Sequence, residues 1–436
     1  MYQESTRQIR DHALANNLQQ NTTVNIFNQW VDHADHSLGT FQQRYWIDLT
    51  NWTEGGPALM YISGEGPASG SPTGYTQIVG YTLGSALFTL EHRYYGESNP
   101  GPITNKTMLK TLTVENALAD LMNFMQFAQA NVLKKSVKWF SVGGSYSGAL
   151  SAWLKETFPI NLVAAYSSSG VVNTRFDYYD FDGHVVSVIP PVCYQAISSV
   201  FETFSDMFDN PSTTAQARAI FGTPDYFTKT DMAWMLADGS AMAVQYGMKE
   251  YLCNSIVPLS KEEPLQQYAK IIEYLWGATF GSSCYYSTKC LSDPTMSSQW
   301  GPSGYCWVYQ CCSQVAYWQS GYPGSLRLRD ITTDYYMDQC RAAFTPDILP
   351  DTYAFNKKFG GAHPDANNVM ATQGSDDPWQ TAGVLQSLSA DYIEVTAQCT
   401  DCGHCGDLHS PQASDPASLT KQREAVLTNL RQWIQG

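Results

Sequence analysis

Short apolar runs, separated by stretches of helical period, recur along the first 170 residues. The runs have the length and the β-branched or aromatic content typical of strands; they are 41–47, 57–62, 86–90, 137–142 and 161–168. One intervening stretch, 113–133, is predicted to be an amphipathic helix with Leu118, Leu121, Met122 and Met125 on one face. Strands that alternate with helices predict an α/β fold with a largely parallel, doubly wound sheet.

This alternation stops near residue 170 and returns near residue 368. The intervening residues are rich in aromatic side chains and helical patterns, which predicts a helical insertion. Further strands are expected at 368–372 and 392–395, and a closing amphipathic helix at 418–435. The first forty or so residues are polar, and we expect them to form a variable approach to the fold. The predicted organisation is an α/β domain formed by 1–172 and 363–436, with 173–362 inserted as a helical cap.

The strand at 137–142 leads through glycines into a predicted helix. A serine at such a strand-to-helix turn is the arrangement of the nucleophile elbow in α/β-hydrolases, usually written Gly-x-Ser-x-Gly. Gly143 and Ser145 fit this pattern, whereas Ser147 occupies the second glycine position and Gly148 follows it. A glycine-rich turn without catalytic function is an equally good explanation of this motif taken alone.

Two later loops supply the partners that a serine nucleophile needs. A base must take the serine proton, and an acid must orient the base, in the chain order Ser, Asp/Glu, His. Asp376 and Asp377 follow the predicted strand at 368–372, and His404 follows the one at 392–395. This agreement of order and position is more specific than the elbow motif.

These motifs, together with others along the chain, match those of a known family. The chain resembles the prolyl serine peptidases, the family that contains lysosomal Pro-Xaa carboxypeptidase, dipeptidyl peptidase II and thymus-specific serine protease, and it is most similar to the thymus-specific branch. The matching segments are Phe-Gln-Gln-Arg-Tyr at 41–45, Gly-Glu-Gly at 64–66, Glu-His-Arg-Tyr-Tyr-Gly-Glu-Ser at 91–98, Gly-Gly-Ser-Tyr-Ser-Gly at 143–148, Tyr-Gln-Cys-Cys at 309–312, Asp-Pro-Trp at 377–379 and Gly-His-Cys at 403–405.

The resemblance implies an α/β-hydrolase domain with a helical cap and a triad of Ser145, Asp377 and His404. Asp376 departs from the family, which usually has an uncharged residue beside the catalytic aspartate. We expect the oxyanion of the acyl-transfer reaction to accept hydrogen bonds from the backbone N–H of Tyr146 and from a loop after an earlier strand. The candidates in that loop are Gly64 and Glu65, although Gly64–Gly66 could simply turn the chain.

The resemblance also implies cleavage after proline. A proline ring requires a small apolar pocket with aromatic walls; the candidates are Trp379, Tyr146, Trp307 and Tyr309, of which the last two are equally compatible with core packing. A dipeptidyl peptidase needs an acid for the substrate amine, and Glu65 is the candidate. A carboxypeptidase needs a cation for the terminal carboxylate, and no Arg or Lys is singled out.

Several other titratable residues have more ordinary explanations. We expect Glu91 and Arg93 to form a buried ion pair beneath the site, and His92 to be a core histidine. His409 lies five positions beyond His404, outside the matched motif, and is expected to be solvated. The cluster Cys399, Cys402, His404 and Cys405 resembles zinc-ligand spacing, but its compactness favours a disulfide within this loop, and we predict neither a metal nor another cofactor.

Net charge and cysteine content indicate which partners and which cellular location to expect. The 436 residues carry a formal charge of −15, which argues against nucleic-acid partners. No run of eighteen apolar residues predicts a membrane span, and the first residues are not a signal peptide. Eleven cysteines and three sequons favour a secreted or lysosomal (vesicular) protein with disulfides, over a cytosolic one with reduced thiols. The sequons begin at Asn21, Asn51 and Asn105.

The sequence therefore predicts a serine exopeptidase that acts on peptides through an acyl-enzyme, of the Xaa-Pro dipeptidyl or Pro-Xaa carboxypeptidase type. Two alternatives remain open: a non-catalytic binding protein with this fold, and an esterase. The sequence also leaves open whether the protein forms a homodimer.

Overall fold

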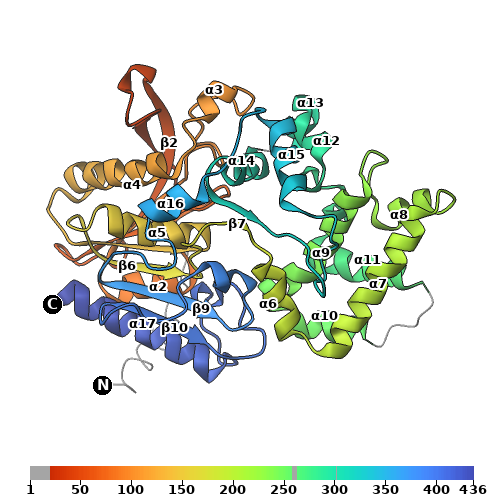
Figure 1. Cartoon of the computed structure of the whole chain (residues 1–436). Coiled ribbons are helices and arrows are strands. Elements are labelled where there is room, and N and C mark those ends of the chain that lie inside the picture. Colours follow the sequence, from red (N-terminus) through yellow and green to blue (C-terminus); the bar gives the residue numbers. More distant parts are fainter. Residues whose placement is uncertain (1–19, 258–262, 301) are drawn as a thin grey trace.

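The computed structural model describes residues 20–257, 263–300 and 302–436. The N-terminal segment in which no signal peptide was expected lies outside the described residues. An eight-stranded sheet forms the centre of the molecule (Figure 1), in the order β1-β2-β4-β3-β5-β6-β9-β10. Its strands are β1 (Asn25–Trp30), β2 (Thr40–Asp48), β3 (Ala58–Ile62), β4 (Ala86–Leu90), β5 (Trp139–Gly144), β6 (Leu162–Ser168), β9 (Val369–Gly374) and β10 (Tyr392–Ala397).

The pairing of these strands is that of an α/β-hydrolase. β1 and β2 are antiparallel to each other, β2 is antiparallel to β4, and all other neighbours are parallel. The carboxyl ends of β5, β9 and β10 consequently meet at one edge of the sheet, where ligands bind in open α/β folds. The predicted fold class is confirmed.

The strand β1 contradicts the expectation that the first forty residues only approach the fold. It pairs with β2 along its whole length, from Asn25–Tyr45 to Trp30–Thr40. Only Phe27 and Gln29 are fully buried in it, and the buried Gln29 side chain donates to Gln43 and to the carbonyl of Asp120. A strand with one apolar inward residue lacks the alternation by which strands are recognised.

Helices cover both faces of the sheet. α2 (Gly74–Thr82) and α17 (Ala417–Gln435) pack on one face, where Ile78, Val426 and Leu430 are buried in one apolar cluster with Leu59. α4 (Val114–Ala128) and α5 (Tyr146–Thr157) lie on the other face (Figure 1). The four residues predicted to form the inner face of α4 are all buried. The short helix α3 (Lys106–Leu109) precedes α4.

The residues between β6 and β9 form mainly helices, which we call the helical insertion. It lies beside the carboxyl ends of the strands (Figure 1). Its helices are α6 (Asp180–Val188), α7 (Pro191–Asp209), α8 (Thr214–Phe221), α9 (Lys229–Gln245), α10 (Lys249–Ile256), α11 (Pro264–Trp276), α12 (Thr288–Ser292), α13 (Pro294–Trp300), α14 (Pro302–Gln310), α15 (Thr333–Ala343) and α16 (Thr352–Lys358). It also contains a parallel pair of short strands, β7 (Arg175–Asp177) and β8 (Ala316–Trp318), which the sequence did not predict.

Four disulfides confirm the expectation of an oxidised protein. Three lie in the insertion, and the fourth lies in the loop after β10, where the sequence predicted one; the pairs are Cys193–Cys253, Cys284–Cys290, Cys312–Cys340 and Cys399–Cys402. Cys306, Cys311 and Cys405 are free. Two of the three cysteines in the cluster whose spacing resembles that of zinc ligands are thus joined to each other.

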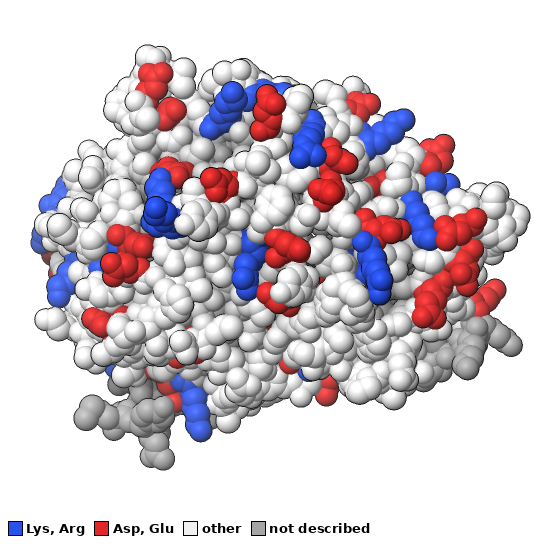
Figure 2. Space-filling view, viewed as in Figure 1, with Lys and Arg blue, Asp and Glu red and all other residues white. Residues whose placement is uncertain are grey.

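The surface shows no concentration of positive charge on the face in Figure 2, where acidic and basic side chains are interspersed among uncharged ones. Among the helices of the described residues, none is both long and apolar enough to cross a membrane. The three sequon asparagines are partly or fully exposed, and Asn105 is exposed at the start of α3.

The expected ion pair between Glu91 and Arg93 is wrong. Arg93 is fully buried and binds Asp120 with two donors, Nε at 2.7 Å and Nη2 at 2.5 Å, and it also donates to three backbone carbonyls. Glu91 pairs with Arg44 instead. Although the two side chains are only two positions apart, they have different partners. A buried charge needs an opposite charge and hydrogen bonds to all its polar atoms, and Asp120 and Arg44 supply these. His92 is buried, as expected.

We predict that Arg93→Met destabilises the fold by about 3 kcal/mol, because it leaves the buried Asp120 carboxylate without its main counter-charge. Urea unfolding measures the effect. The matched control is Arg341→Met, whose pair with Asp338 is exposed and should contribute less than about 1 kcal/mol. Equal losses in the two variants would contradict the importance assigned to the buried pair.

Candidate active site

The backbone at Ser145 has the strained geometry of a nucleophile elbow. Ser145 is the N-cap residue of α5 and has φ of 61° and ψ of −126°. A non-glycine residue rarely adopts a positive φ, and its cost of about 1–3 kcal/mol is tolerated mainly where function requires it. Its N–H donates to the carbonyl of Ser168 at 2.9 Å. The turn therefore fixes Ser145 at the carboxyl edge of the sheet, between β5 and α5.

Close backbone approach explains the glycines around Ser145. A Cβ at Gly143 would lie 2.0 Å from the carbonyl oxygen of Ser147, and one at Gly148 would lie 2.6 Å from that of Ser168. Neither position can carry a side chain without moving the backbone. Gly148, one place later than the usual motif, thus meets the strict requirement for glycine.

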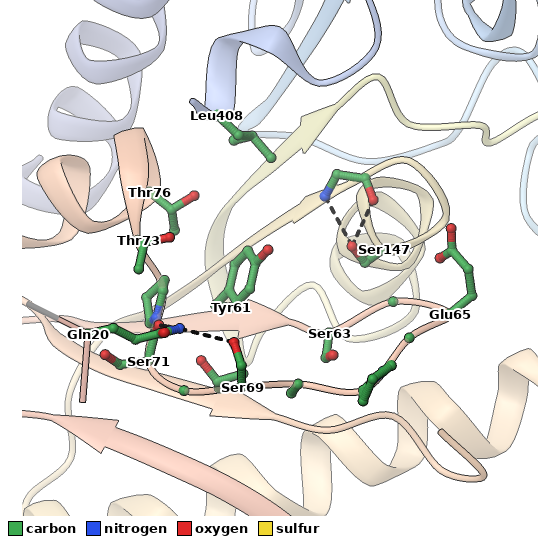
Figure 3. A pocket seen from close by; sticks show the side chains of 18 of the residues that line it. Gln20, Tyr61, Ser63, Glu65, Ser69, Ser71, Thr73, Thr76, Ser147 and Leu408 are labelled. Atoms are coloured by element: carbon green, nitrogen blue, oxygen red, sulfur yellow. Dashed lines mark hydrogen bonds between the residues drawn. The ribbon is translucent and has the colours of Figure 1, made fainter. Parts of the chain in front are cut away.

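Ser147 stabilises the same turn. Its Oγ accepts from the N–H of Gly144 at 3.1 Å and donates to the carbonyl of Gly144 at 2.8 Å (Figure 3). The serine at the second glycine position is therefore compatible with the elbow, because its side chain folds back onto the strand end.

His404 and Asp377 form a buried hydrogen-bonded pair. Nδ1 of His404 lies 2.7 Å from Oδ2 of Asp377, and both side chains are almost completely buried. The other carboxylate oxygen of Asp377 accepts from the N–H of Trp379 at 2.9 Å. Nε2 of His404 is buried and makes no hydrogen bond of ordinary geometry with the described residues, although the Cys405 side chain lies close to the ring. This nitrogen is therefore free to take a proton.

The electrostatics of this pair favour the charged imidazole. Burial opposes a charge on His404, but the adjacent Asp377 carboxylate outweighs it and raises the pKa of His404 well above its ordinary value, with a smaller effect from Cys405. An imidazole that is stabilised when it gains a proton suits a general base.

The loop after β10, which carries the candidate base His404 and is called the base loop below, contacts the Ser145 elbow through Cys405. The thiol of Cys405 donates to the carbonyl of Ser168 at 3.7 Å, the same carbonyl that accepts from the N–H of Ser145. A Cβ at Gly144 would lie 2.9 Å from this sulfur. Ser145 and the residue next to His404 therefore share one backbone acceptor, which places the two loops side by side.

Asp407, which the sequence did not single out, joins the loop after β10 to the strands β6 and β9. Its buried carboxylate accepts hydrogen bonds from Tyr166, from Ser168 at 2.5 Å and from Thr372 at 2.5 Å. These three hydroxyls come from the ends of β6 and β9. No motif around Asp407 indicates this function, because its partners are 35 to 241 positions away.

The residues predicted to form the oxyanion hole are adjacent to the elbow. Tyr146 is the first residue of α5, so its N–H belongs to the donors that a helix leaves unpaired at its start. A Cβ on Gly64 would lie 3.6 Å from Cβ of Ser147, so the loop after β3 lies against the first turn of α5. The Tyr146 side chain is buried and binds Nε2 of His92 and the amide of Gln310 in α14.

A polar cavity of about 580 Å³ opens along this loop (Figure 3). Gly64, Glu65, Ser147 and His409 are among its lining residues. Glu65 is half-buried; its partial removal from water raises the pKa of its carboxyl, and the nearby His404 partly offsets this effect. His409 is exposed, as expected.

A second, smaller cavity lies between the sheet and the helical insertion, on the side of Trp379. It has a volume of about 40 Å³, and aromatic rings from both parts of the chain line it. The ring of Trp379 is 6.3 Å from that of His404 and 5.6 Å from that of Tyr317. Trp307 lines this cavity, whereas Tyr309 does not and packs against Phe344.

Among the described residues, no group of three or more His, Cys, Asp or Glu side chains could hold a metal ion.

Comparison with known proteins identifies the family of the chain. Residues 29–426 match the family described as serine carboxypeptidase S28. Probable serine protease EDA2 of Arabidopsis thaliana is 29% identical, over 94% of this chain and 88% of that protein. Thymus-specific serine protease of Mus musculus is 25% identical over 91% and 84%, and lysosomal Pro-X carboxypeptidase of Pongo abelii is 26% identical over 95% and 88%.

The family match spans nearly the whole chain, and both parts of the fold lie within it. The chain belongs to the serine carboxypeptidase S28 family, and it is a serine-type peptidase.

Proposed function

We propose that the protein is a serine exopeptidase that cleaves peptides after proline, with Ser145 as nucleophile, His404 as general base and Asp377 as the residue that orients His404. The observation that carries the proposal is the buried pair of Asp377 and His404. Nε2 of His404 is not used in this pair, and the loop that carries His404 contacts the Ser145 elbow. The helical insertion, residues 173–362, is proposed to be the cap that limits access to this site.

The reaction proceeds through an acyl-enzyme. Ser145 Oγ attacks the peptide carbonyl while His404 takes its proton, and the same proton then passes to the leaving amine. Water attacks the ester in the second half of the reaction and regenerates Ser145. The N–H of Tyr146 and a donor from Gly64 or Glu65 are proposed to stabilise the oxyanion.

The small aromatic cavity supports a preference for proline. Its size and its walls, which include Trp379, Trp307 and Tyr317, suit a compact apolar ring. The preference also agrees with the relative named lysosomal Pro-X carboxypeptidase. Disulfides and this relationship together support a secreted or lysosomal location, and Asn21, Asn51 and Asn105 are proposed to be glycosylation sites.

We predict that a fluorophosphonate probe labels Ser145, which peptide mapping of the adduct would show. His404→Ala should reduce peptidase activity by at least about 10⁴-fold, because it removes the proposed acceptor of the serine proton. His363→Ala is the matched control and should keep full activity, because His363 is exposed and precedes β9. A folded protein that takes no label would contradict the proposed function, as would higher activity on p-nitrophenyl esters than on Xaa-Pro amides.

We predict that kcat/KM rises with pH through an apparent pKa above about 6.5, the ordinary value for histidine. The base must be neutral to act, and Asp377 stabilises its charged form, so activity is lost as pH falls through the raised pKa of His404. Asp377→Asn should move this limb to lower pH and reduce kcat. An acid limb below the ordinary histidine value in the wild type would contradict the assignment of His404.

The mode of cleavage is tested at Glu65, which we propose binds the amine of a dipeptidyl substrate. Glu65→Gln should raise the KM of a Gly-Pro amide with a free amine and leave the KM of its N-acetylated form unchanged. For the wild-type enzyme, replacing proline by alanine in this substrate should lower kcat/KM by about 10-fold or more. Glu97→Gln is the control, since Glu97 is exposed and pairs with Arg44. An unchanged KM in Glu65→Gln would favour the carboxypeptidase mode.

A further inference from the structure

Asp376, the second acid of the Asp-Asp pair, takes its counter-charge from the helical insertion. Nζ of Lys249, at the start of α10, lies 2.7 Å from Oδ2 of Asp376, and the two side chains are 12% and 6% exposed. The same Oδ2 accepts from the N–H of Asp401 at 2.7 Å. Asp376 thus connects α10 to two loops, the one that carries Asp377 and the one that carries His404.

The backbone beside Lys249 contacts the base directly. The carbonyl of Gln245, the last residue of α9, accepts from the N–H of His404 at 2.6 Å. The N–H of Glu250 donates to the Asp401 carboxylate at 3.3 Å. A Cβ at Gly403 would lie 2.4 Å from the Gln245 carbonyl, so the two backbones are in close contact. Residues 245–250, the junction between α9 and α10, therefore pack against the loop of the catalytic base.

This junction is itself fixed. The disulfide Cys193–Cys253 joins α10 to α7, four residues beyond Lys249. A lysine held by a cross-linked helix keeps its ammonium in place at a lower entropic cost than a lysine on a mobile segment.

Other titratable groups lie near the Lys249–Asp376 pair and near His404, and they contribute to the local electrostatic potential. His184 of α6 faces Asp376, Asp377 and Lys249, and its Nε2 lies 3.0 Å from the carbonyl of Ser375. Asp401 and Glu250 lie on the side of the base loop. His404 is in turn faced by Asp377, Cys405, Glu65 and Tyr246. Lys249 is the cation that pairs with Asp376.

We propose that Lys249 is a positioning residue for the peptidase reaction: by pairing with Asp376 it joins the helical insertion to the loops of Asp377 and His404, and it balances the negative charge next to the acid. This inference rests on the proposed triad. The ammonium of Lys249 acts through Asp376, and it is not proposed to contact the substrate.

The test uses the pH profile of kcat/KM for three variants. In Lys249→Met the Asp376 charge remains unbalanced, which favours the imidazolium, so the acid limb should move to higher pH by about 0.5 unit. In Asp376→Asn the lysine charge remains, so the limb should move to lower pH. The double variant should return close to the wild-type position. The asparagine oxygen can still accept from the N–H of Asp401, which preserves that contact.

Opposite shifts distinguish positioning from a general loss of stability, which would affect both single variants in the same sense. Titration of active sites with the fluorophosphonate probe corrects for unfolded protein. On that basis kcat of Lys249→Met should fall about 10-fold, with little change in KM, because a displaced base impairs chemistry more than binding. Lys249→Arg should restore most of the loss.

The matched control is Lys229→Met. Lys229 also forms an ion pair within the insertion, with Asp209, but this pair is remote from both catalytic loops; its pH profile should not move. Shifts of the same sign in Lys249→Met and Asp376→Asn, or no shift in either, would overturn the proposal. A wild-type protein without label or peptidase activity would instead overturn the proposed function, so the two failures can be told apart.

Discussion

The hydrogen bond between Asp377 and His404 sets the conditions that the rest of the structure must meet. A carboxylate and an imidazole can remain paired away from water only if each has fixed partners and if nothing competes for them. The parallel pairing of β9 with β10 brings the two loops together, and the neighbouring backbone supplies the remaining contacts. The free Nε2 is the one position in this pair that is left for chemistry.

The strained turn at Ser145 depends on the same edge of the sheet. Parallel strands end together there, so the Ser145 elbow and the loops of Asp377 and His404 lie at one edge, although Asp377 is 232 positions beyond Ser145 in the chain. Asp407 strengthens this edge, because its carboxylate joins hydroxyl groups from β6 and β9. Tyr146 extends the connection through Gln310 into the helical insertion. The turn at Ser145 is thus supported by both parts of the fold.

Much of this could be predicted from the sequence, for physical reasons. Buried parallel strands are continuous apolar runs, so β3, β4, β5, β6, β9 and β10 were recognisable, and Asp377 and His404 could be assigned to the loops that follow β9 and β10. The strand β1 escaped recognition because Gln29 occupies one of its two buried positions. Partners of charged residues were the least predictable feature: Arg93 binds Asp120 rather than Glu91, and Lys249 meets Asp376 across 127 positions, because long-range contacts depend on packing that no local pattern records.

The contact between Gln245 and His404 has a consequence for how substrates enter and leave. If the helical insertion swung outward as a rigid lid, it would pull on the backbone of His404, the proposed base. With the triad proposed above, the end of α9 must therefore stay in contact with this loop while a peptide is cleaved. A peptide would then have to enter and leave without a hinged movement of this part of the insertion.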